Sequence, residues 1–370
     1  MKLRRWMALL GAALCLLLCA CGIPMPDSQD AVVIWSLEGD ALLPPLQQRI
    51  DEYNEDPGGL LPVRLRTFPD EESLAAAFKT ARPDLLLCTH ARATALYESG
   101  VLQDIRTELG EGAPQYPESM TSVFEGMGCS YYPVGSAVTL LYAERDKLPP
   151  AAYGNLESLC RFAAAYGEKE GSAFFTADSF SALFYQGMLS WKAEFHARPQ
   201  QDERSEVYVT LFNLVTNGAF TGGIVSADIG GKTLVESGAL PCAAVESTQL
   251  IAATEDGKII VPLPGLKETK ELLGCCQGFA VTLRPGRSSR SVTAFLQWLF
   301  AEGRANRLAL DAGMVPAMIG AAPAANSALD LTLLQIGRDY RIHLPDPTGD
   351  YWRSEESFEK DFRAALTRFL

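Results

Sequence analysis

The sequence is poor in the residues that build metal sites. Its 370 residues contain three histidines, His90, His196 and His343. The cysteines that follow Cys21 show no Cys-x-x-Cys spacing, so no metal site is expected. We expect mostly free, buried thiols, because most of these cysteines lie within apolar runs, where cysteine behaves as a small hydrophobic residue. They are Cys88, Cys129, Cys160, Cys242, Cys275 and Cys276.

Familiar catalytic motifs are also missing. The chain has no Gly-x-Ser-x-Gly elbow, no glycine-rich phosphate loop and no His-Glu-x-x-His helix. Its acidic pairs, such as Glu71-Glu72 and Glu355-Glu356, fall on predicted helix faces or ends, where carboxylates are usually solvated. Without a nucleophile placed beside a base, neither catalysis nor a cofactor is expected. A hydrolase that works with acidic residues is the enzymatic alternative.

Positive charge is in short supply. Lysine and arginine number 32 against 45 acidic residues, which gives a net charge of −13. This balance disfavours nucleic acid, which needs clustered basic side chains. It gives no reason to expect an anionic ligand, although a local basic pocket can override the average charge. With 48% hydrophobic and 21% charged residues, the chain is expected to fold around a sizeable core.

The first 21 residues resemble a bacterial lipoprotein signal. Lys2, Arg4 and Arg5 precede an apolar stretch at 7–20, and Leu-x-Ala-Cys ends at Cys21. This stretch is short for a spanning helix, which needs about 20 residues. The resemblance implies cleavage before Cys21 and a diacylglycerol on its sulfur. The alternatives are an ordinary secretory signal or an uncleaved anchor. Residues 22–30 then read as a tether, and no later apolar run reaches spanning length.

The body of the chain alternates strands with helices. Apolar or alternating runs at 31–35, 63–68 and 84–88 predict strands, and periodic segments at 42–53, 71–79 and 91–99 predict helices. This order is typical of an α/β sheet flanked by helices. Further strands are predicted at 138–142, 241–245, 258–262 and 278–283, and further helices at 156–166, 180–191, 206–217, 291–300 and 305–312. The chain after 326 is expected to be mostly helical, ending in a helix at 357–370.

A series of short segments occurs in a distinctive order. The segments lie at 32–35, 50–54, 82–87, 100–105, 132–146, 262–265, 294–299 and 312–316. In this order they resemble the extracellular solute-binding proteins of ABC importers, the group that includes maltose-binding protein. The resemblance covers nearly all of the chain after the signal.

The resemblance implies a two-lobed, type II periplasmic-binding-protein-like α/β fold with the ligand cleft between the lobes. Lobe 1 is expected at 31–135 plus 266–316, and lobe 2 at 136–265 plus 317–370. The expected hinge residues are Gly135, Ser136, Pro264, Gly265 and Pro316. The implied function is a monomeric, lipid-anchored extracytoplasmic receptor that delivers a solute, with carbohydrate as the first candidate, to membrane permease subunits. A sensor or adhesin of the same fold is the alternative.

Candidate ligand contacts follow the first and third strands. Trp35 could stack on a sugar ring or belong to the core. Glu38 and Asp40 could accept hydrogen bonds from ligand hydroxyls or cap the next helix, and we favour a ligand role for one of them. Thr89 and His90 follow the third strand. For His90 we favour a solvated loop position over a ligand contact.

Other candidates lie at the first crossover and in the second lobe. Tyr132 could pack in the hinge or face the cleft. Glu246 and Ser247 follow a predicted strand at a place where many relatives carry an aromatic residue, so stacking from this loop is in doubt. Tyr185 and Trp191 are expected in the lobe 2 core, whereas Tyr351 and Trp352 could cap the cleft or lie on the surface.

Overall fold

The computed structural model describes residues 30–118, 120, 127, 130–191, 201–284, 286, 289–320, 323–344, 359–360 and 363–364. The predicted signal peptide, Cys21 and nearly all of the tether lie outside these residues, as do Cys129, Tyr351, Trp352 and most of the predicted helix at 357–370. The side chain of Trp191 is not described either. Within the described residues, no helix is both long and apolar enough to cross a membrane.

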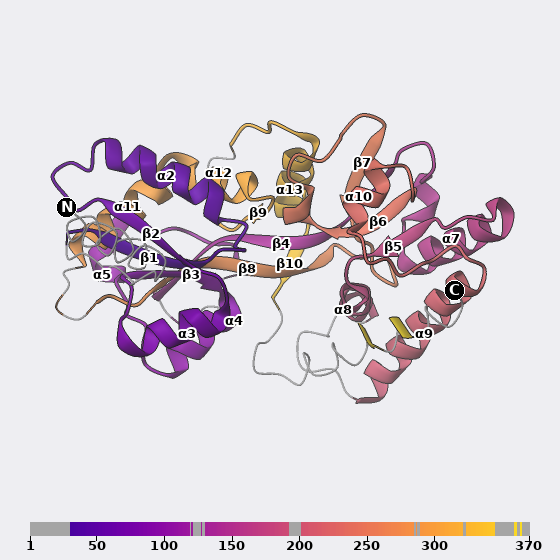
Figure 1. Cartoon of the computed structure of the whole chain (residues 1–370), viewed down its shortest axis with the longest axis horizontal. Coiled ribbons are helices and arrows are strands. Elements are labelled where there is room, and N and C mark those ends of the chain that lie inside the picture. The colour runs from indigo at the N-terminus through magenta and orange to yellow at the C-terminus, as the bar shows by residue number, and fades with distance from the viewer. Residues whose placement is uncertain are drawn as a thin grey trace, which may run out of the picture.

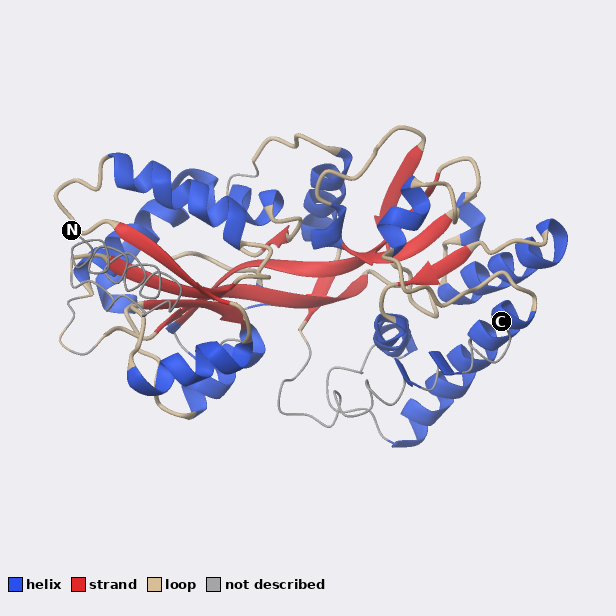
Figure 2. Ribbon diagram, in the orientation of Figure 1, coloured by secondary structure: helices blue, strands red, loops and turns tan. Residues whose placement is uncertain are grey.

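The first lobe is a sheet with helices on both faces (Figures 1 and 2). Its strands are β1 (Val32–Leu37), β2 (Val63–Phe68), β3 (Leu85–Thr89) and one end of β8 (Glu271–Val281). One face carries α2 (Leu43–Glu55), α5 (Arg106–Leu109), η1 (Gly110–Gly112), α11 (Arg290–Phe300), η5 (Ala301–Gly303) and α12 (Arg304–Asp311). The other face carries α3 (Glu71–Thr80) and α4 (His90–Glu98). The predicted alternation of strands and helices is therefore confirmed here.

Burial on both faces explains why β1 is apolar throughout. Val32 and Ile34 pack into the core beneath α2 and α11, whereas Val33 and Trp35 pack into the core beneath α3. β1 is parallel to both β2 and β3, and strands of buried parallel sheets read as continuous apolar runs.

Asp84 ties the start of this sheet together. Its carboxylate is fully buried, accepts a 2.9 Å hydrogen bond from the Val33 amide and pairs with Arg284 at 2.8 Å. Arg284 in turn donates to the Ala31 carbonyl at 2.5 Å. Asp84 therefore fixes β1 and the segment after β8 to the start of β3, because an unpaired buried carboxylate would be strongly unfavourable.

The second lobe has its own sheet and two apolar cores. The strands are the far end of β4 (Tyr131–Glu144), β5 (Phe175–Ala177), β6 (Cys242–Glu246) and β7 (Lys258–Pro262). One face packs against α7 (Leu156–Glu170), α8 (Phe180–Trp191) and α9 (Gln201–Phe220), next to η3 (Pro150–Ala152). The other face packs against α10 (Gly231–Glu236) and α13 (Ala328–Asp339), with η4 (Ser247–Leu250) and β10 (Arg341–His343) nearby. Tyr185 is buried in the core on the α8 side, as predicted.

Two antiparallel strands, β4 and β8, run from one lobe to the other (Figure 1). β4 pairs with β8 from Tyr131 to Val138 and then with β6 and β7. The short β9 (Val315–Pro316) pairs with the middle of β4. The β4–β8 register shifts between Pro133 and Gly135. A β-carbon at Gly135 would lie 2.9 Å from those of Ala309 and Met314, so glycine is required for this close approach.

The sequence underestimates the strands that join the lobes. β4 begins seven residues before the predicted strand at 138–142, and β8 begins seven residues before the one predicted at 278–283. The added parts contain Gly274, Gln277 and Gly135, which weaken an isolated strand but are held here by pairing with neighbouring strands. β5, β9 and β10 were not predicted. Among the described residues after 326, α13 bears out the mostly helical chain expected there, and β10 adds a short strand.

Candidate functional site

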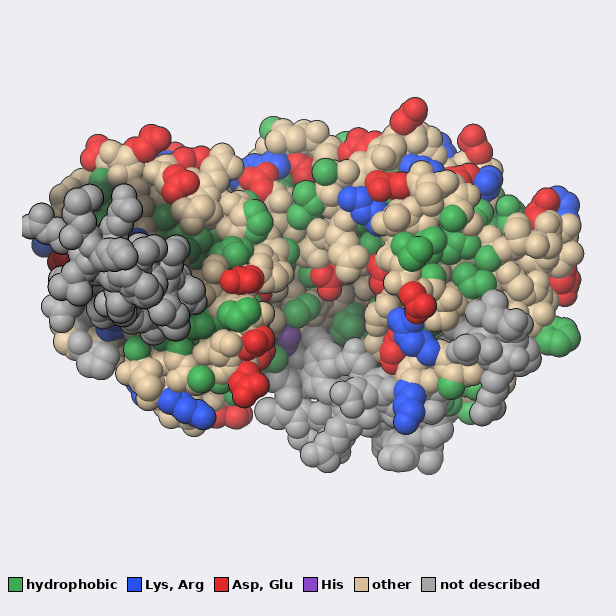
Figure 3. Space-filling model, in the orientation of Figure 1, with side chains coloured by type: hydrophobic (Ala, Val, Ile, Leu, Met, Phe, Trp, Pro, Cys, Tyr) green, Lys and Arg blue, Asp and Glu red, His purple; other side chains and the backbone are tan. Residues whose placement is uncertain are grey.

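The carboxyl ends of strands from both lobes face each other. β1 and β3 end toward the second lobe, because both are antiparallel to β8, which leads from the second lobe into the first. β5 and β6 end toward the first lobe, because β6 is antiparallel to β4. The molecular surface is hollowed between the lobes, and acidic side chains gather along the first-lobe edge of the hollow (Figure 3). Loops at such strand ends are the usual ligand-binding positions of open α/β sheets.

Asp40 lies three residues after β1 and is half-buried. Its Oδ2 accepts hydrogen bonds from the Ser36 hydroxyl at 2.6 Å and the Leu37 amide at 3.2 Å. Burial raises the pKa of Asp40, and these two hydrogen bonds and the charge of Arg92 oppose that rise. Arg92, on α4, also forms an ion pair with Glu71 on α3. Both of these hydrogen bonds use Oδ2 of Asp40.

Glu38, Thr89 and His90 occupy different positions. Glu38 is exposed at the same edge as Asp40. Thr89 caps α4, and its hydroxyl accepts from the Arg92 amide at 3.4 Å. His90 is the first residue of α4 and is 2% exposed, so the solvated loop position expected for it is wrong. It is buried because the helix begins directly at the end of β3.

Trp35 lies in the core rather than at the surface. Its ring is fully buried, 4.9 Å from the ring of Phe68 and 6.1 Å from that of Phe78, and the Arg66 guanidinium lies 5.0 Å from its centroid. The alternation of β1 points Trp35 toward α3. Its faces are therefore covered by protein, and the core role is the one that the structure supports. Tyr132 is likewise buried, with its ring 5.5 Å from Phe300.

The second-lobe edge carries Glu246, Ser247 and Asp178. Glu246 is exposed at the end of β6 and accepts a hydrogen bond from the Thr248 hydroxyl. Ser247 is fully buried and accepts from the Val138 amide at 3.2 Å, so it holds the loop against β4. Asp178, which the sequence reading missed, follows β5 directly and accepts from the Gly231 amide at 2.7 Å.

The second oxygen of Asp178, Oδ2, is buried and makes no hydrogen bond with a described residue. Burial raises the pKa of Asp178, against the Gly231 hydrogen bond and the charge of Arg363. Arg363 donates to the Asp178 carbonyl at 3.2 Å and to Glu359 at 2.6 Å. The sequence signal for Asp178 was its position directly after the short strand Phe-Thr-Ala. A run of three residues is too short to be recognised as a strand from sequence.

Cys275 lies on one of the two strands that join the lobes. It lies on β8, paired with Ala137 of β4. Burial, with the negative charges of Glu246 and Asp40, raises the pKa of the Cys275 thiol to about 11. One thiol on the joining strands is thus within electrostatic range of a carboxylate from each lobe. The five described cysteines are all free, as expected.

Three of the five predicted hinge residues lie together. Gly135 pairs with Pro316, and the neighbouring Ser136 pairs with Val315. Pro264 and Gly265 follow β7 instead, and the Gly265 carbonyl accepts from the Leu156 amide at 2.7 Å. A β-carbon at Gly265 would lie 2.3 Å from that of Ser190, so this segment packs within the second lobe.

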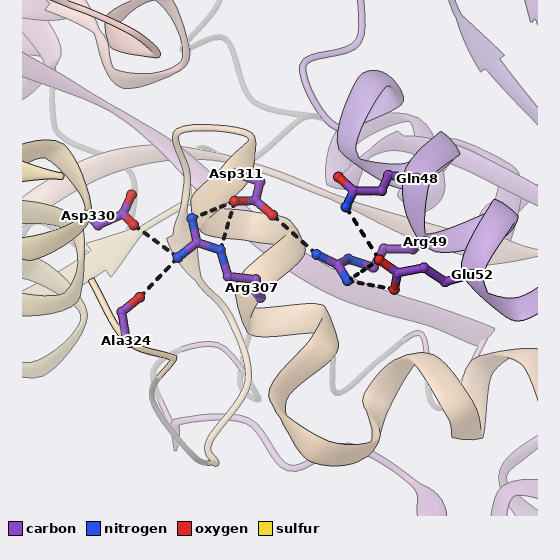
Figure 4. A network of polar contacts seen from close by, with 7 residues as sticks. All are labelled: Gln48, Arg49, Glu52, Arg307, Asp311, Ala324 and Asp330. Carbon is purple, nitrogen blue, oxygen red and sulfur yellow. Dashed lines mark hydrogen bonds and ion pairs between the residues drawn. The ribbon is translucent and has the colours of Figure 1, made fainter. Parts of the chain in front are cut away.

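An ion-pair network links the lobes on the other side of the joining strands. In Figure 1, α12 and α13 lie on the opposite side of β4 and β8 from α4 and α8. Arg307 of α12 pairs with Asp330 of α13 at 3.0 Å and donates to the Ala324 carbonyl at 3.0 Å (Figure 4). It also pairs with Asp311, which contacts Arg49 of α2 at 3.5 Å. α12 and α13 each carry a buried apolar face, and the sequence pattern of these two helices gave no sign that their charged residues pair.

The described residues contain no group of three or more histidine, cysteine, aspartate or glutamate side chains that could hold a metal ion. What the geometry defines is a two-lobed protein with polar groups facing each other across a pair of joining strands.

Comparison with known proteins confirms this fold. No family profile and no curated protein sequence matches the chain. Solved structures do. The cyclic alpha-maltosyl-1,6-maltose binding protein from Arthrobacter globiformis has a TM-score of 0.69 at 14% identity, over 92% of this chain and 94% of that one. A probable secreted solute-binding lipoprotein from Streptomyces coelicolor scores 0.68 at 16%, over 93% and 99%. UgpB from Mycobacterium tuberculosis, in complex with glycerophosphocholine, scores 0.67 at 16%, over 92% and 97%. The predicted two-lobed, periplasmic-binding-protein-like fold is therefore confirmed.

Proposed function

We propose that this protein is a lipid-anchored, extracytoplasmic receptor that binds a solute between its lobes and delivers it to an ABC importer. The observation that carries the proposal is that strands from the two lobes end facing each other, with Asp40 at the edge of one lobe and Glu246 at the edge of the other. Groups contributed by both lobes let a ligand stabilise one relative orientation of the lobes, which is how hinge-closing binding proteins respond to ligand.

Carbohydrate is the solute that we favour. Carboxylates make strong hydrogen bonds with hydroxyl donors, and Asp40 and Glu246 both present such acceptors. Two of the similar structures are described as binding a maltosyl sugar or as a solute-binding lipoprotein, which supports the proposal at the level of the fold. Since Trp35 is buried, the described residues contribute polar contacts rather than its indole face.

A titration panel tests the ligand. The purified protein is titrated calorimetrically with mono- and oligosaccharides, glycerophosphocholine and a polyamine. We expect a sugar to bind, and Asp40→Asn and Glu246→Gln each to weaken that binding about tenfold or more, as for hydrogen bonds to charged groups. Glu157→Gln, on the exposed surface of α7, is the matched control and should bind normally. Binding of another solute with no response to any sugar would refute the carbohydrate assignment.

The anchor and the transporter need separate tests. Cys21→Ala should release the protein into the culture medium, and full retention in the membrane would contradict lipidation. Crosslinking in cells should capture two permease subunits. Their absence, with ligand binding intact, would favour a sensor or adhesin, and sugar cleavage in a glycosidase assay would indicate the hydrolase alternative.

A further inference from the structure

A small cavity lies between the two lobes, beside the ion pair between Arg307 and Asp330. Its volume is about 200 Å³, below the range of about 300–1,000 Å³ that is usual for drug-sized ligands, so only a compact molecule fits. The first lobe contributes residues of α12, and the second lobe contributes residues of η4, β7, α13 and the loop after η4. The lining residues include Ile251, Glu255, Ile260, Arg307, Asp311 and Asp330.

The wall from the second lobe presents accessible apolar surface. Ile251 is 40% exposed and Ile260 of β7 is half-buried, and both line the cavity. The loop that carries Ile251 is held in place, because the Ile251 carbonyl accepts from Lys232 at 3.0 Å and the Thr254 carbonyl accepts from the Tyr142 hydroxyl at 2.6 Å. Covering this surface with a hydrocarbon group is favourable, since apolar area is removed from water.

The charge of the lining favours a cation. Among the described lining residues, Asp311, Asp330 and Glu255 are carboxylates, and Arg307 is already paired with both aspartates. Glu255 is exposed, and its Oε1 accepts from the Ala328 amide at 2.7 Å. It forms no ion pair with a described residue. A cation in the cavity is therefore attracted to Glu255, whereas an anion is repelled.

The two walls belong together only in the orientation of the lobes seen here. A β-carbon at Gly313, two residues after α12, would lie 2.7 Å from the Ser247 carbonyl oxygen and 3.1 Å from Cγ1 of Ile251, so the lobes are in contact beside the cavity. A rotation that brings α4 toward α8 moves α12 away from α13, because the two helix pairs lie on opposite sides of β4 and β8 (Figure 1). A molecule that contacts both walls therefore opposes closure through its differential affinity for the two orientations.

We propose that this cavity binds a compact apolar ammonium, a primary amine on a branched or cyclic hydrocarbon, and that such a molecule lowers the affinity of the receptor for its solute. The hydrocarbon covers Ile251 and Ile260, and the ammonium group faces Glu255. The effect on solute binding rests on the proposed function, whereas the site itself does not.

Titration of the purified, methyl-labelled protein with cyclohexylammonium tests the site by nuclear magnetic resonance. We expect the methyl signals of Ile251 and Ile260 to shift, and cyclohexanol, the neutral analogue, to shift them less. Glu255→Gln should weaken binding of the amine about tenfold, as expected for the loss of a hydrogen bond to a charged group. Absence of a shift at both residues, or equal binding by Glu255→Gln and the parent, would overturn the site.

Glu236→Gln is the matched control. Glu236 also accepts a hydrogen bond from a backbone amide, that of Thr254 at 2.9 Å, but it does not line the cavity. This variant should bind cyclohexylammonium as the parent does. Equal weakening in Glu236→Gln and Glu255→Gln would assign the attraction to the general surface charge and overturn the role of Glu255.

Calorimetry separates the site from its effect on the receptor. The sugar that the titration panel identifies is titrated with and without saturating cyclohexylammonium. We expect its affinity to fall, and the amine to bind the sugar-loaded protein more weakly by the same factor. Unchanged sugar affinity together with the methyl shifts supports the site and overturns its regulatory role. If no solute binds, the receptor function fails and the regulatory role falls with it, while the methyl titration still decides the site.

Discussion

Replacing Arg307 by methionine tests how the two lobes are held. Arg307 lies on α12 and reaches Asp330 on α13, across the side of the joining strands that is opposite α4 and α8. A rotation about β4 and β8 that brings α4 toward α8 must move α12 away from α13. The ion pair therefore opposes closure, and Arg307→Met should favour it. Methionine keeps much of the apolar stem but removes the charged fork.

The size of the effect follows from burial. The Asp330 side chain is 6% exposed and that of Arg307 is 20% exposed. Removing one partner of a fully buried ion pair costs about 3–5 kcal/mol, whereas exposed pairs contribute about 0–1 kcal/mol. Asp330 keeps its hydrogen bond from the Asn326 amide at 2.9 Å. We therefore expect a loss of about 1–2 kcal/mol, which changes the ratio of lobe orientations by about 5- to 30-fold.

Spin labels on the two lobes measure this ratio without knowledge of the ligand. Arg64 of β2 and Lys169 of α7 are exposed and provide sites for introduced cysteines, with the unsubstituted protein as the background for native thiols. Electron–electron dipolar spectroscopy should show a second distance in Arg307→Met that is minor in the parent. Arg338→Met, which breaks an exposed pair on α13, is the control. Identical distance distributions in Arg307→Met and the parent would refute the reasoning.

Three further changes test the fold and the site. Asp84→Asn should lower the free energy of unfolding in urea by about 3 kcal/mol, because the Arg284 charge loses its buried partner, whereas a loss below 1 kcal/mol would contradict the role of Asp84. Gly135→Ala should lower the free energy of unfolding by about 1–3 kcal/mol through overpacking. Gly154→Ala, which has open space around it, should lower it much less. Equal shifts in the thermal unfolding temperature of the two variants would contradict the close approach at β4. Burial raises the pKa of Cys160 to about 12, so this thiol stays protonated and unalkylated through pH 9 until the protein unfolds, and peptide mapping that finds rapid native labelling would contradict its burial.

The first lobe is well predicted from the sequence because its signals are local. β1, β2 and β3 are uninterrupted apolar or alternating runs, and each is followed by a helix with recognisable ends. Asp70 caps α3 through the Ser73 amide, and Gly100 follows α4 with a positive φ. Such elements need no partner to be recognised, since propensity and periodicity agree with the fold.

The joining strands were underestimated because their stability comes from pairing. Residues 271–277 of β8 include two cysteines, a glycine and a glutamine, a composition with weak strand preference. These residues form a strand because β4 lies beside them, and β10 lies beside the first three. A single sequence does not show which distant segment supplies a neighbour, so the most important connection between the lobes is also the least visible locally.

The candidate ligand contacts also differ in how far local sequence predicts their positions. Asp40 and Glu246 were identifiable as candidates because Asp40 lies three residues after β1 and Glu246 is the last residue of β6, and position alone brings them to the facing edges. Trp35 ends the strand predicted at 31–35, but β1 continues to Leu37, and side-chain alternation sends Trp35 into the core beneath α3. Position near a strand end therefore predicts which residues reach the space between the lobes only when the face of the sheet toward which each side chain points is also known.

The two sides of the joining strands then have different physical roles. On one side, Asp40 and Glu246 carry the acceptors that the proposed ligand would bridge, and that bridge would favour closure by its free energy. On the other, Arg307 and Asp330 are already bridged within the protein and favour the orientation seen here. To close the lobes, a ligand must bind Asp40 and Glu246 strongly enough to outweigh the ion pair between Arg307 and Asp330. Its measured affinity is therefore reduced by the free energy needed to separate α12 from α13. Arg307→Met should accordingly tighten binding of whichever solute the titration identifies, whereas Glu246→Gln should weaken it. Calorimetry on both variants measures these opposite changes. A general loss of stability would instead weaken binding in both variants.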